Sequence, residues 1–136
     1  MEKGMKFDGE KLRTDLYPID AFLETCKVLT YGAKKYAPRN WEKGFEWSRA
    51  YGALLRHLFA FWQGEELDPE TGIHHLAHAH CELIFLQCFQ MRHVGQDDRP
   101  FHLGEGWPTD MVVKHIKHMP THWRLGDPVP EEGGNT

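Results

Sequence analysis

The segment GEELDPETGIHHLAHAHCE, residues 64–82, concentrates side chains that can bind a metal ion. Four carboxylates are followed within this segment by four histidines and a final glutamate. Mixed carboxylate and imidazole ligands suit Mg²⁺ or Mn²⁺, and imidazole favours Mn²⁺ of the two. Structural zinc fits less well, because no thiolate joins the cluster at ligand spacing and the zinc-protease pattern HExxH is absent.

Three of these groups fall on one face of the helix that the pattern predicts here. At about 100° per residue, His75, His78 and Glu82 lie within about 60° of arc, and apolar residues continue the same line. This stripe should face the protein interior, where an ionised carboxylate requires a compensating cation. Metal sites in helical bundles use carboxylate and histidine at such spacings. His74 and His80 point away from the stripe and are expected to face solvent.

The acidic loop before this helix adds oxygen ligands, although it also has a purely structural interpretation. Asp68, which precedes a proline, is typical of a helix N-cap, and Glu70 suits the first turn of a helix. Capping does not explain Glu65 and Glu66. We therefore add Glu65 and Asp68 to the candidate metal ligands, while the capping role of Asp68 and the role of Glu66 stay open.

The elements that must position these groups are predicted to be helices only. Hydrophobic periodicity indicates an all-α fold, a small helical bundle with helices over residues 18–36, 49–63 and 70–93. Ser48 and Asp68 are the expected N-caps of the second and third helices. The second helix is apolar over most of its circumference, which predicts burial on more than one side. The third is expected to bury Leu76 and Leu83 among its apolar residues.

The composition limits the classes of protein to which the chain can belong. The chain has 136 residues and a formal net charge of −4, so nucleic-acid binding through a basic surface is not expected. No apolar run of membrane-spanning length occurs, which predicts a soluble, cytoplasmic protein without a membrane partner. The three cysteines form no CxxC pair and are expected to be reduced. Residues 1–96 are expected to form one domain with an N-terminal basic arm, and residues 97–136 a Pro-rich, partly irregular extension with a short helix over 109–119.

A cluster of divalent cations with few candidate nucleophiles points to hydrolysis of a phosphate ester or anhydride. Basic side chains are then expected near the phosphates. Candidates occur in the N-terminal arm and in the segment YGAKKYAPRNW, and Arg56 and His57 stand inside the apolar second helix, where a guanidinium requires a partner. Trp41 could stack on a base, although core packing is the usual role of tryptophan. The basic candidates outside the second helix are Lys6, Lys11, Arg13, Lys34, Lys35 and Arg39.

Taken in order, the segments KFDGEKLRTDLYP, VLTYGAKKYAPRNWEKG and WSRAYGALLRHLFAFWQGEELDPETGIHHLAHAHCELIFL resemble the N-terminal domain family of phage and bacterial dATP/dGTP diphosphohydrolases. That family belongs with the MazG-like all-α nucleotide pyrophosphatases, and the resemblance covers about residues 6–92. Within it, the chain looks most similar to enzymes of phages whose DNA carries 2-aminoadenine. Those enzymes convert dGTP to dGMP for synthesis of the modified nucleotide.

The resemblance implies a metal-activated water that attacks the α-phosphorus, with pyrophosphate leaving. One departure is that MazG-like enzymes use ExxE and ExxD carboxylate pairs, whereas His78 stands here where a carboxylate would be expected. The implied metal ligands are Glu65, Asp68, His75, His78 and Glu82. The implied substrate contacts are Lys6, Lys11 and Arg13 in the arm motif and Lys34, Asn40 and Trp41 in the GAKKY..RNW motif.

We therefore expect a Mg²⁺- or Mn²⁺-dependent enzyme, with two or three ions, that hydrolyses a purine deoxynucleoside triphosphate to the monophosphate and pyrophosphate. The leading substrate is dGTP, with GTP beside it, and Glu65 or Glu82 is expected to take the proton of the attacking water. Two alternatives stay open: a non-catalytic module that binds metal and nucleotide, and a plain helical interaction protein. Because three helices leave apolar surface uncovered, a homo-oligomer, either dimer or tetramer, is also expected.

Overall fold

The computed structural model describes residues 2–100. Internal contacts divide the chain into two units, Met1–Asp98 and Arg99–Thr136, and the helical fold belongs to the first. The expected extension over 97–136, with its helix over 109–119, lies almost wholly outside the described residues, so this domain division stays a prediction. The elements are a 3₁₀ turn η1 (Thr14–Leu16), helix α1 (Ile19–Lys35), a 3₁₀ turn η2 (Asn40–Lys43), helix α2 (Trp47–Trp62) and helix α3 (His75–Arg92).

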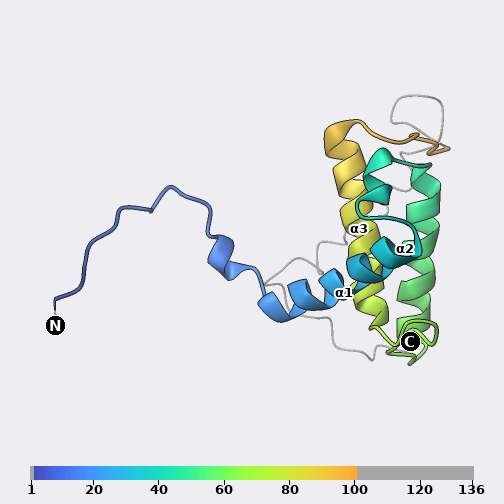
Figure 1. Cartoon of the computed structure of the whole chain (residues 1–136), viewed down its shortest axis with the longest axis horizontal. Coiled ribbons are helices and arrows are strands. Elements are labelled where there is room, and N and C mark those ends of the chain that lie inside the picture. The colour runs from blue at the N-terminus through green and yellow to red at the C-terminus, as the bar shows by residue number, and fades with distance from the viewer. Residues whose placement is uncertain (1, 101–136) are drawn as a thin grey trace, which may run out of the picture. The chain divides into compact units, whose positions relative to one another are not determined.

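Helix α3 is the centre of the bundle. It lies side by side with α2, and α1 and η2 also pack on it (Figure 1). The all-α fold is therefore confirmed, since the described residues form helices and turns without a β-strand. Most of the buried side chains come from α3, which is covered on two sides. The buried apolar residues are Ala50, Ala77, Ala79, Cys81 and Phe89.

The predicted start of the third helix at residue 70 is wrong by five residues. Helix α3 begins at His75, and Gly72 has a φ of +70°, a conformation that cannot continue a right-handed helix. Asp68 does act through its side chain, but it closes a turn instead of capping α3. Its Oδ1 accepts the backbone N–H groups of Glu70 and Thr71, at 2.8 and 3.3 Å. The acidic segment is consequently a loop held in one conformation beside the start of α3.

Helix α2 is capped by a residue from the far end of the domain. The helix begins at Trp47, so the predicted N-cap at Ser48 is wrong by two positions, and Glu46 is the N-cap. The carboxylate of Asp98 accepts hydrogen bonds from the backbone N–H of Ser48, at 2.8 Å, and from its hydroxyl. A carboxylate is favourable there because the N-terminus of a helix carries unpaired N–H groups and a partial positive charge.

Two glycines allow the segments on either side of this cap to cross closely. Gly44 and Gly95 have φ values of +85° and +78°. A Cβ on Gly95 would lie 2.4 Å from the carbonyl oxygen of Phe45, and a Cβ on Gly44 would lie 2.5 Å from the backbone nitrogen of Gly95. Side chains at either position would push the two segments apart. Phe45, which lines a cleft between the helices, is therefore fixed by this crossing.

The predicted burial of the outer faces of α2 and α3 is wrong. On α2, Tyr51, Phe59 and Trp62 are exposed, and on α3 Leu76 and Leu83 are 46% and 51% exposed. These two leucines lie on the side of α3 that faces neither α1 nor α2. Apolar periodicity identifies faces that avoid water, but one copy of the chain does not supply the elements to cover them all.

His80 is a structural histidine and not the surface residue that was predicted. It is half-buried, and its Nδ1 lies 3.1 Å from Oγ1 of the buried Thr25 in α1. The Thr25 hydroxyl donates to the carbonyl of Ala21, at 3.0 Å, so the imidazole Nδ1–H donates to Oγ1. The Nε2 atom then accepts from the Tyr17 hydroxyl, at 3.1 Å. His80 thus ties α1 and the segment before it to α3. His74 is exposed, as predicted.

Cys26, Cys81 and Cys88 are all free thiols, in agreement with the prediction of reduced cysteines. Among the described residues, no helix is long and apolar enough to cross a membrane.

Candidate functional site

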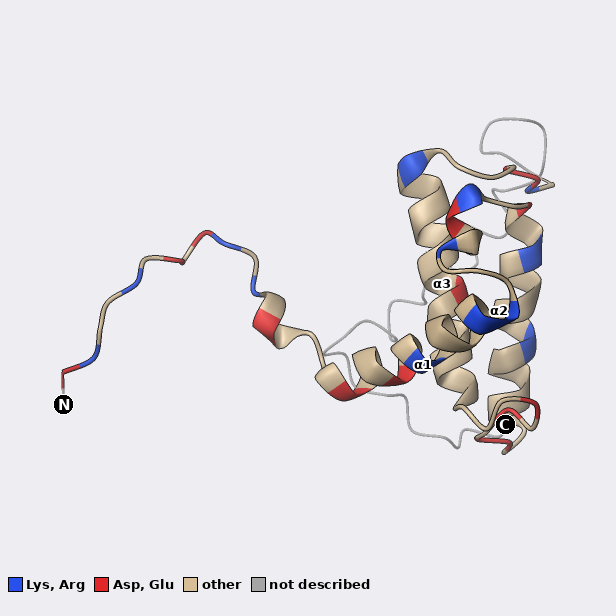
Figure 2. Cartoon of the chain, in the orientation of Figure 1, with Lys and Arg blue, Asp and Glu red and all other residues tan. Residues whose placement is uncertain are grey.

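The candidate site begins with the loop that joins α2 to α3. Figure 2 shows acidic residues gathered in this loop. Backbone hydrogen bonds fix its course: the N–H of Asp68 donates to the carbonyl of Ile73, at 2.9 Å, and the N–H of His75 donates to the carbonyl of Glu66, at 2.9 Å. This folding brings the side chain of Asp68 beside His75, although seven positions separate them in the sequence.

Three residues from three elements converge here. His57 from α2, Asp68 from the loop and His75 from α3 place their potential ligand atoms within 4.8 Å of one another. Nδ1 of His57 lies 2.9 Å from Nδ1 of His75 and 3.8 Å from Oδ2 of Asp68. His75 is buried, while His57 and Asp68 are half-buried. Two imidazoles and one carboxylate in this arrangement form a donor set for one divalent ion.

Two further predicted ligands, Glu65 and His78, contact residues of this group. Oε1 of Glu65 lies 2.7 Å from Nε2 of His75, so the carboxylate accepts the Nε2–H and leaves Nδ1 of His75 free to act as an acceptor or ligand. The ring of His78 stacks on that of His57 with centroids 4.6 Å apart, and its Nε2 lies 2.7 Å from Oγ1 of Thr71. In this structure Glu65 orients one imidazole and His78 packs on the other.

The surroundings of His57 and His78 favour their neutral forms. Burial lowers the pKa of His57, and the neighbouring His78 lowers it further, against an opposing effect of Asp68. Burial also lowers the pKa of His78. For Asp68, desolvation raises the pKa, but the N–H groups of Glu70 and Thr71 and the nearby histidines outweigh it, and the net shift is downward. Neutral imidazole and ionised carboxylate are the states that bind metal ions.

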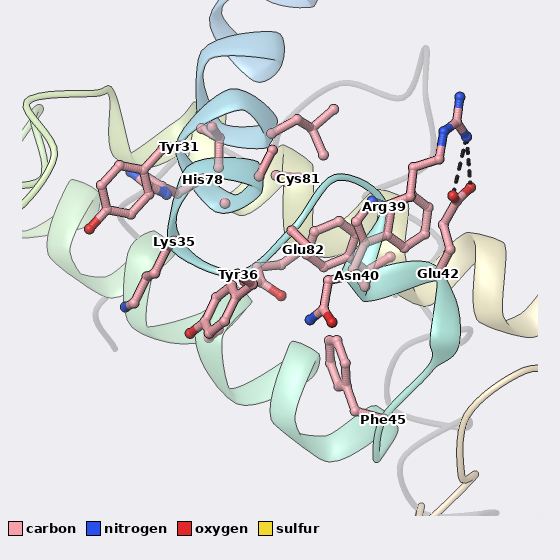
Figure 3. A pocket seen from close by; sticks show the side chains of 18 of the residues that line it. Tyr31, Lys35, Tyr36, Arg39, Asn40, Glu42, Phe45, His78, Cys81 and Glu82 are labelled. Atoms are coloured by element: carbon pink, nitrogen blue, oxygen red, sulfur yellow. Dashed lines mark hydrogen bonds and ion pairs between the residues drawn. The ribbon is translucent and has the colours of Figure 1, made fainter.

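Two cavities with lining residues in common lie here, and only the smaller is lined by the cluster. The smaller has a volume of about 380 Å³ and is lined by His57, Asp68 and His75, among others. The larger is a cleft of about 1170 Å³ between α1, η2, α2 and α3 (Figure 3). Lys35 and Arg56 line both. Ligand sites commonly measure about 300–1,000 Å³, so the larger cleft is large enough for a molecule of nucleotide size with an anionic part near these two cations.

Glu82 lines the larger cleft and lies outside the three-residue cluster. Its carboxyl group receives no hydrogen bond from the described residues, and burial raises its pKa to about 7 against a lowering effect of Arg56. Burial likewise raises the pKa of the neighbouring Cys81 to about 12, so this thiol is inert.

Glu82→Gln is expected to stabilise the metal-free protein at pH 8. A folded-state pKa raised to about 7 means that ionisation of Glu82 opposes folding; the penalty is absent below pH 4.5, grows between pH 4.5 and 7, and is complete above pH 7. The amide removes this penalty, which should raise the free energy of unfolding by about 2 kcal/mol after allowance for partial exposure.

Urea unfolding at pH 8 and pH 5 measures the difference in stability between Glu82→Gln and the wild type, and the gain should largely vanish at pH 5. Glu24→Gln, which alters a solvated pair with Lys27, is the matched control; equal changes in both variants would contradict the assignment.

Two of the aromatic residues that line the cleft, Trp41 and Tyr36, differ in how far their rings are packed. Trp41 stacks on Phe85 with centroids 4.6 Å apart, and the guanidinium of Arg92 lies 5.6 Å from the Trp41 ring. The Trp41 ring is therefore occupied in packing, which disfavours the predicted stacking on a base. Tyr36, by contrast, lines the cleft and is 68% exposed.

Only some of the predicted substrate-binding residues line the cavities. Asn40, Trp41 and Arg56 line the cleft, although Arg56 is exposed and not buried as predicted. Lys34 does not line either cavity, whereas the adjacent Lys35 lines both. The three arm residues are exposed and line neither cavity, and their role stays a prediction; they are Lys6, Lys11 and Arg13.

His57 is the member of the cluster that the predicted ligand set lacks. The sequence signal for it was its position, together with Arg56, inside an otherwise apolar helix. That signal marks a polar group that requires a partner, but it does not identify the partner. Only the packing of α2 against α3 places His57 beside His75.

Comparison with known proteins agrees with the resemblance in the sequence. Residues 1–99 match the family described as dATP/dGTP diphosphohydrolase, N-terminal. The chain belongs to this family. One relative in it is the dATP/dGTP diphosphohydrolase of Salmonella phage PMBT28, which is 34% identical over 96 residues. The match covers 71% of this chain and 33% of the relative, so the chain spans about a third of the length of that protein. No solved structure matches the chain.

Proposed function

We propose that this chain is a metal-dependent nucleotide diphosphohydrolase that converts a purine deoxynucleoside triphosphate, with dGTP or GTP as leading substrates, to the monophosphate and pyrophosphate. The observation that carries the proposal is the cluster of His57, Asp68 and His75 beside a cleft of nucleotide size, with Lys35 and Arg56 at the junction. The relative's name, dATP/dGTP diphosphohydrolase, supports the same reaction class with a deoxynucleoside triphosphate as substrate.

The donor set fits a divalent ion. The Nδ1 atoms of His57 and His75 are 2.9 Å apart, the distance of a hydrogen bond between the two rings. Two nitrogens that bind one ion at about 2.1 Å and at right angles are about 3.0 Å apart, so an ion could take the place of the proton in that hydrogen bond. Two imidazoles with one carboxylate favour Mn²⁺ over Mg²⁺, which prefers oxygen ligands throughout. His57, Asp68 and His75 would hold the ion. The expectation of two or three ions, with His78 and Glu82 as further ligands, stays a prediction.

Different residues of the chain would have different roles in hydrolysis. When bound, the ion supplies Lewis-acid polarisation of a phosphate oxygen and a lowered pKa for water. Lys35 and Arg56 neutralise the charge of the phosphates at the junction of the cavities. Of the two carboxylates expected to take the proton of the water, Glu65 lies beside the cluster and Glu82 lines the other cavity. Glu65 accepts the Nε2–H of His75, on the side of the ring opposite Nδ1, and so holds His75 in the tautomer that leaves its Nδ1 unprotonated. Which of the two carboxylates takes the proton of the water stays a prediction.

We further propose, on the resemblance of the sequence, that the product is dGMP for synthesis of 2-aminoadenine nucleotides, and that the chain is a homo-oligomer. The exposed apolar side chains on α2 and α3 support self-association, because a soluble monomer rarely leaves so many large apolar groups in water.

Product analysis tests the reaction. With dGTP and Mn²⁺, chromatography should resolve dGMP and pyrophosphate in equal amounts, and EDTA should stop turnover. Release of orthophosphate with dGDP would overturn the proposed cleavage at the α-phosphorus. Tight dGTP binding without product over hours would instead indicate a binding module. A melting temperature that Mn²⁺ leaves unchanged would indicate a helical interaction protein.

A further inference from the structure

The cleft contains a carboxylate, Glu82, that lies outside the three-residue metal cluster. Glu82 follows His75 by seven positions on α3, about two turns, so both lie on the same face and are separated by about 10 Å along the helix. This separation is comparable with that between the α-phosphorus of a nucleotide and the edge of its base. A nucleotide with its α-phosphate at an ion held by His57, Asp68 and His75 would therefore reach, with the edge of its base, the part of the cleft that Glu82 lines.

The surroundings of Glu82 suit a planar, hydrogen-bonding ligand. In Figure 3 its carboxyl group points into the cleft toward Tyr36 and Asn40. The Tyr36 ring is 68% exposed, and Nζ of Lys35 lies over one face, 5.5 Å from the ring centroid. The other face is available for stacking, which is worth about 1–3 kcal/mol for a base on an aromatic ring. The carboxyl group has no hydrogen-bond donor among the described residues, so a ligand in the cleft could satisfy both of its oxygens.

From this geometry we infer that Glu82 determines base preference by accepting the N1–H and 2-amino hydrogens of guanine while Tyr36 stacks on the ring. An ionised carboxylate is an acceptor only, and guanine presents two adjacent donors on this edge. Adenine presents an unprotonated N1 there, which would face the carboxylate without a hydrogen between them. The inference rests on the proposed function, and it makes Glu82 a specificity residue and not a metal ligand or proton acceptor.

The expected result is a change of base preference with retained turnover. At pH 8, where the carboxylate is ionised, the wild-type chain with Mn²⁺ should have a higher kcat/KM for dGTP than for dITP, which lacks the 2-amino group, and than for dATP. In Glu82→Gln the ratio of dGTP to dATP should fall about 10- to 100-fold, since an amide is a two-point partner of adenine. In Glu82→Met the preferences for dGTP over dITP and over dATP should both be lost, and kcat/KM for dATP should not rise. Glu24→Gln, outside both cavities, should leave all ratios unchanged.

The outcomes separate failure of this inference from failure of the proposed function. If the wild-type chain releases no monophosphate from any of these substrates, the proposed function fails. If it turns them over and the ratios are the same in Glu82→Gln and Glu82→Met as in the wild type, the inference fails alone. An equal fall in kcat for all substrates in both variants would place Glu82 at the reacting phosphate and would also overturn the inference. Circular dichroism checks that each variant is folded, and equilibrium binding of dGMP against dAMP gives the same preference without turnover.

Discussion

His57→Ala is expected to reduce turnover of dGTP by at least about 100-fold and to weaken Mn²⁺ binding by a similar factor. Removal of a residue that only hydrogen-bonds to a metal ligand commonly lowers metal affinity or activity 10–100-fold. His57 is placed among the ligands themselves. Its Nδ1 lies 2.9 Å from Nδ1 of His75, so its loss leaves one imidazole and one carboxylate, too few protein donors to hold the ion tightly.

The measurement is calorimetric titration of the metal-free protein with Mn²⁺, followed by steady-state kinetics at saturating metal. His74→Ala is the matched control, because His74 is exposed, makes no side-chain cap to α3 and lies next to His75 in the sequence. The control should bind Mn²⁺ as the wild type does. Unchanged Mn²⁺ affinity in His57→Ala would refute the three-residue site and would return the ligand set to Glu65, Asp68, His75, His78 and Glu82.

Phe89→Ala is expected to lower the free energy of unfolding by about 3–5 kcal/mol, a large part of the stability of a domain this size. Phe89 is only 1% exposed. Its ring packs edge-on against Phe45, with centroids 5.0 Å apart, and against Trp41 at 6.2 Å. Removal of the ring leaves a cavity beneath the wall of the cleft that these two residues form.

Phe59→Ala is the control of the same chemistry, since Phe59 lies on α2 and is 61% exposed. Urea unfolding followed by circular dichroism should give a loss below about 1 kcal/mol for this variant in the monomer. Both variants are measured at several protein concentrations. A loss for Phe59→Ala as large as that for Phe89→Ala, growing with protein concentration, would show that the exposed face of α2 is covered by another copy of the chain.

Much of the fold could be predicted from the sequence because helix formation depends on local patterns. The ends of α1 and α2 agree with the pattern to within two residues, since proline, glycine and apolar spacing act over a few positions. The start of α3 could not be predicted in this way. Asp68 and Pro69 resemble a helix start, but a turn closed by Asp68 and the positive φ of Gly72 delay the helix to His75.

For the site, the sequence by itself determined which residues share a helix face. His75 and His78 are buried on one stripe of α3, as their spacing predicts, because the helical repeat alone sets that alignment. Only the tertiary structure decided which neighbours meet that stripe. The packing of α2 on α3 brings His57 to His75, and it leaves Glu82, two turns further along α3, in the larger cleft. The rotation of one helix against another depends on side chains along both, so contacts between helices are not contained in the periodicity of either.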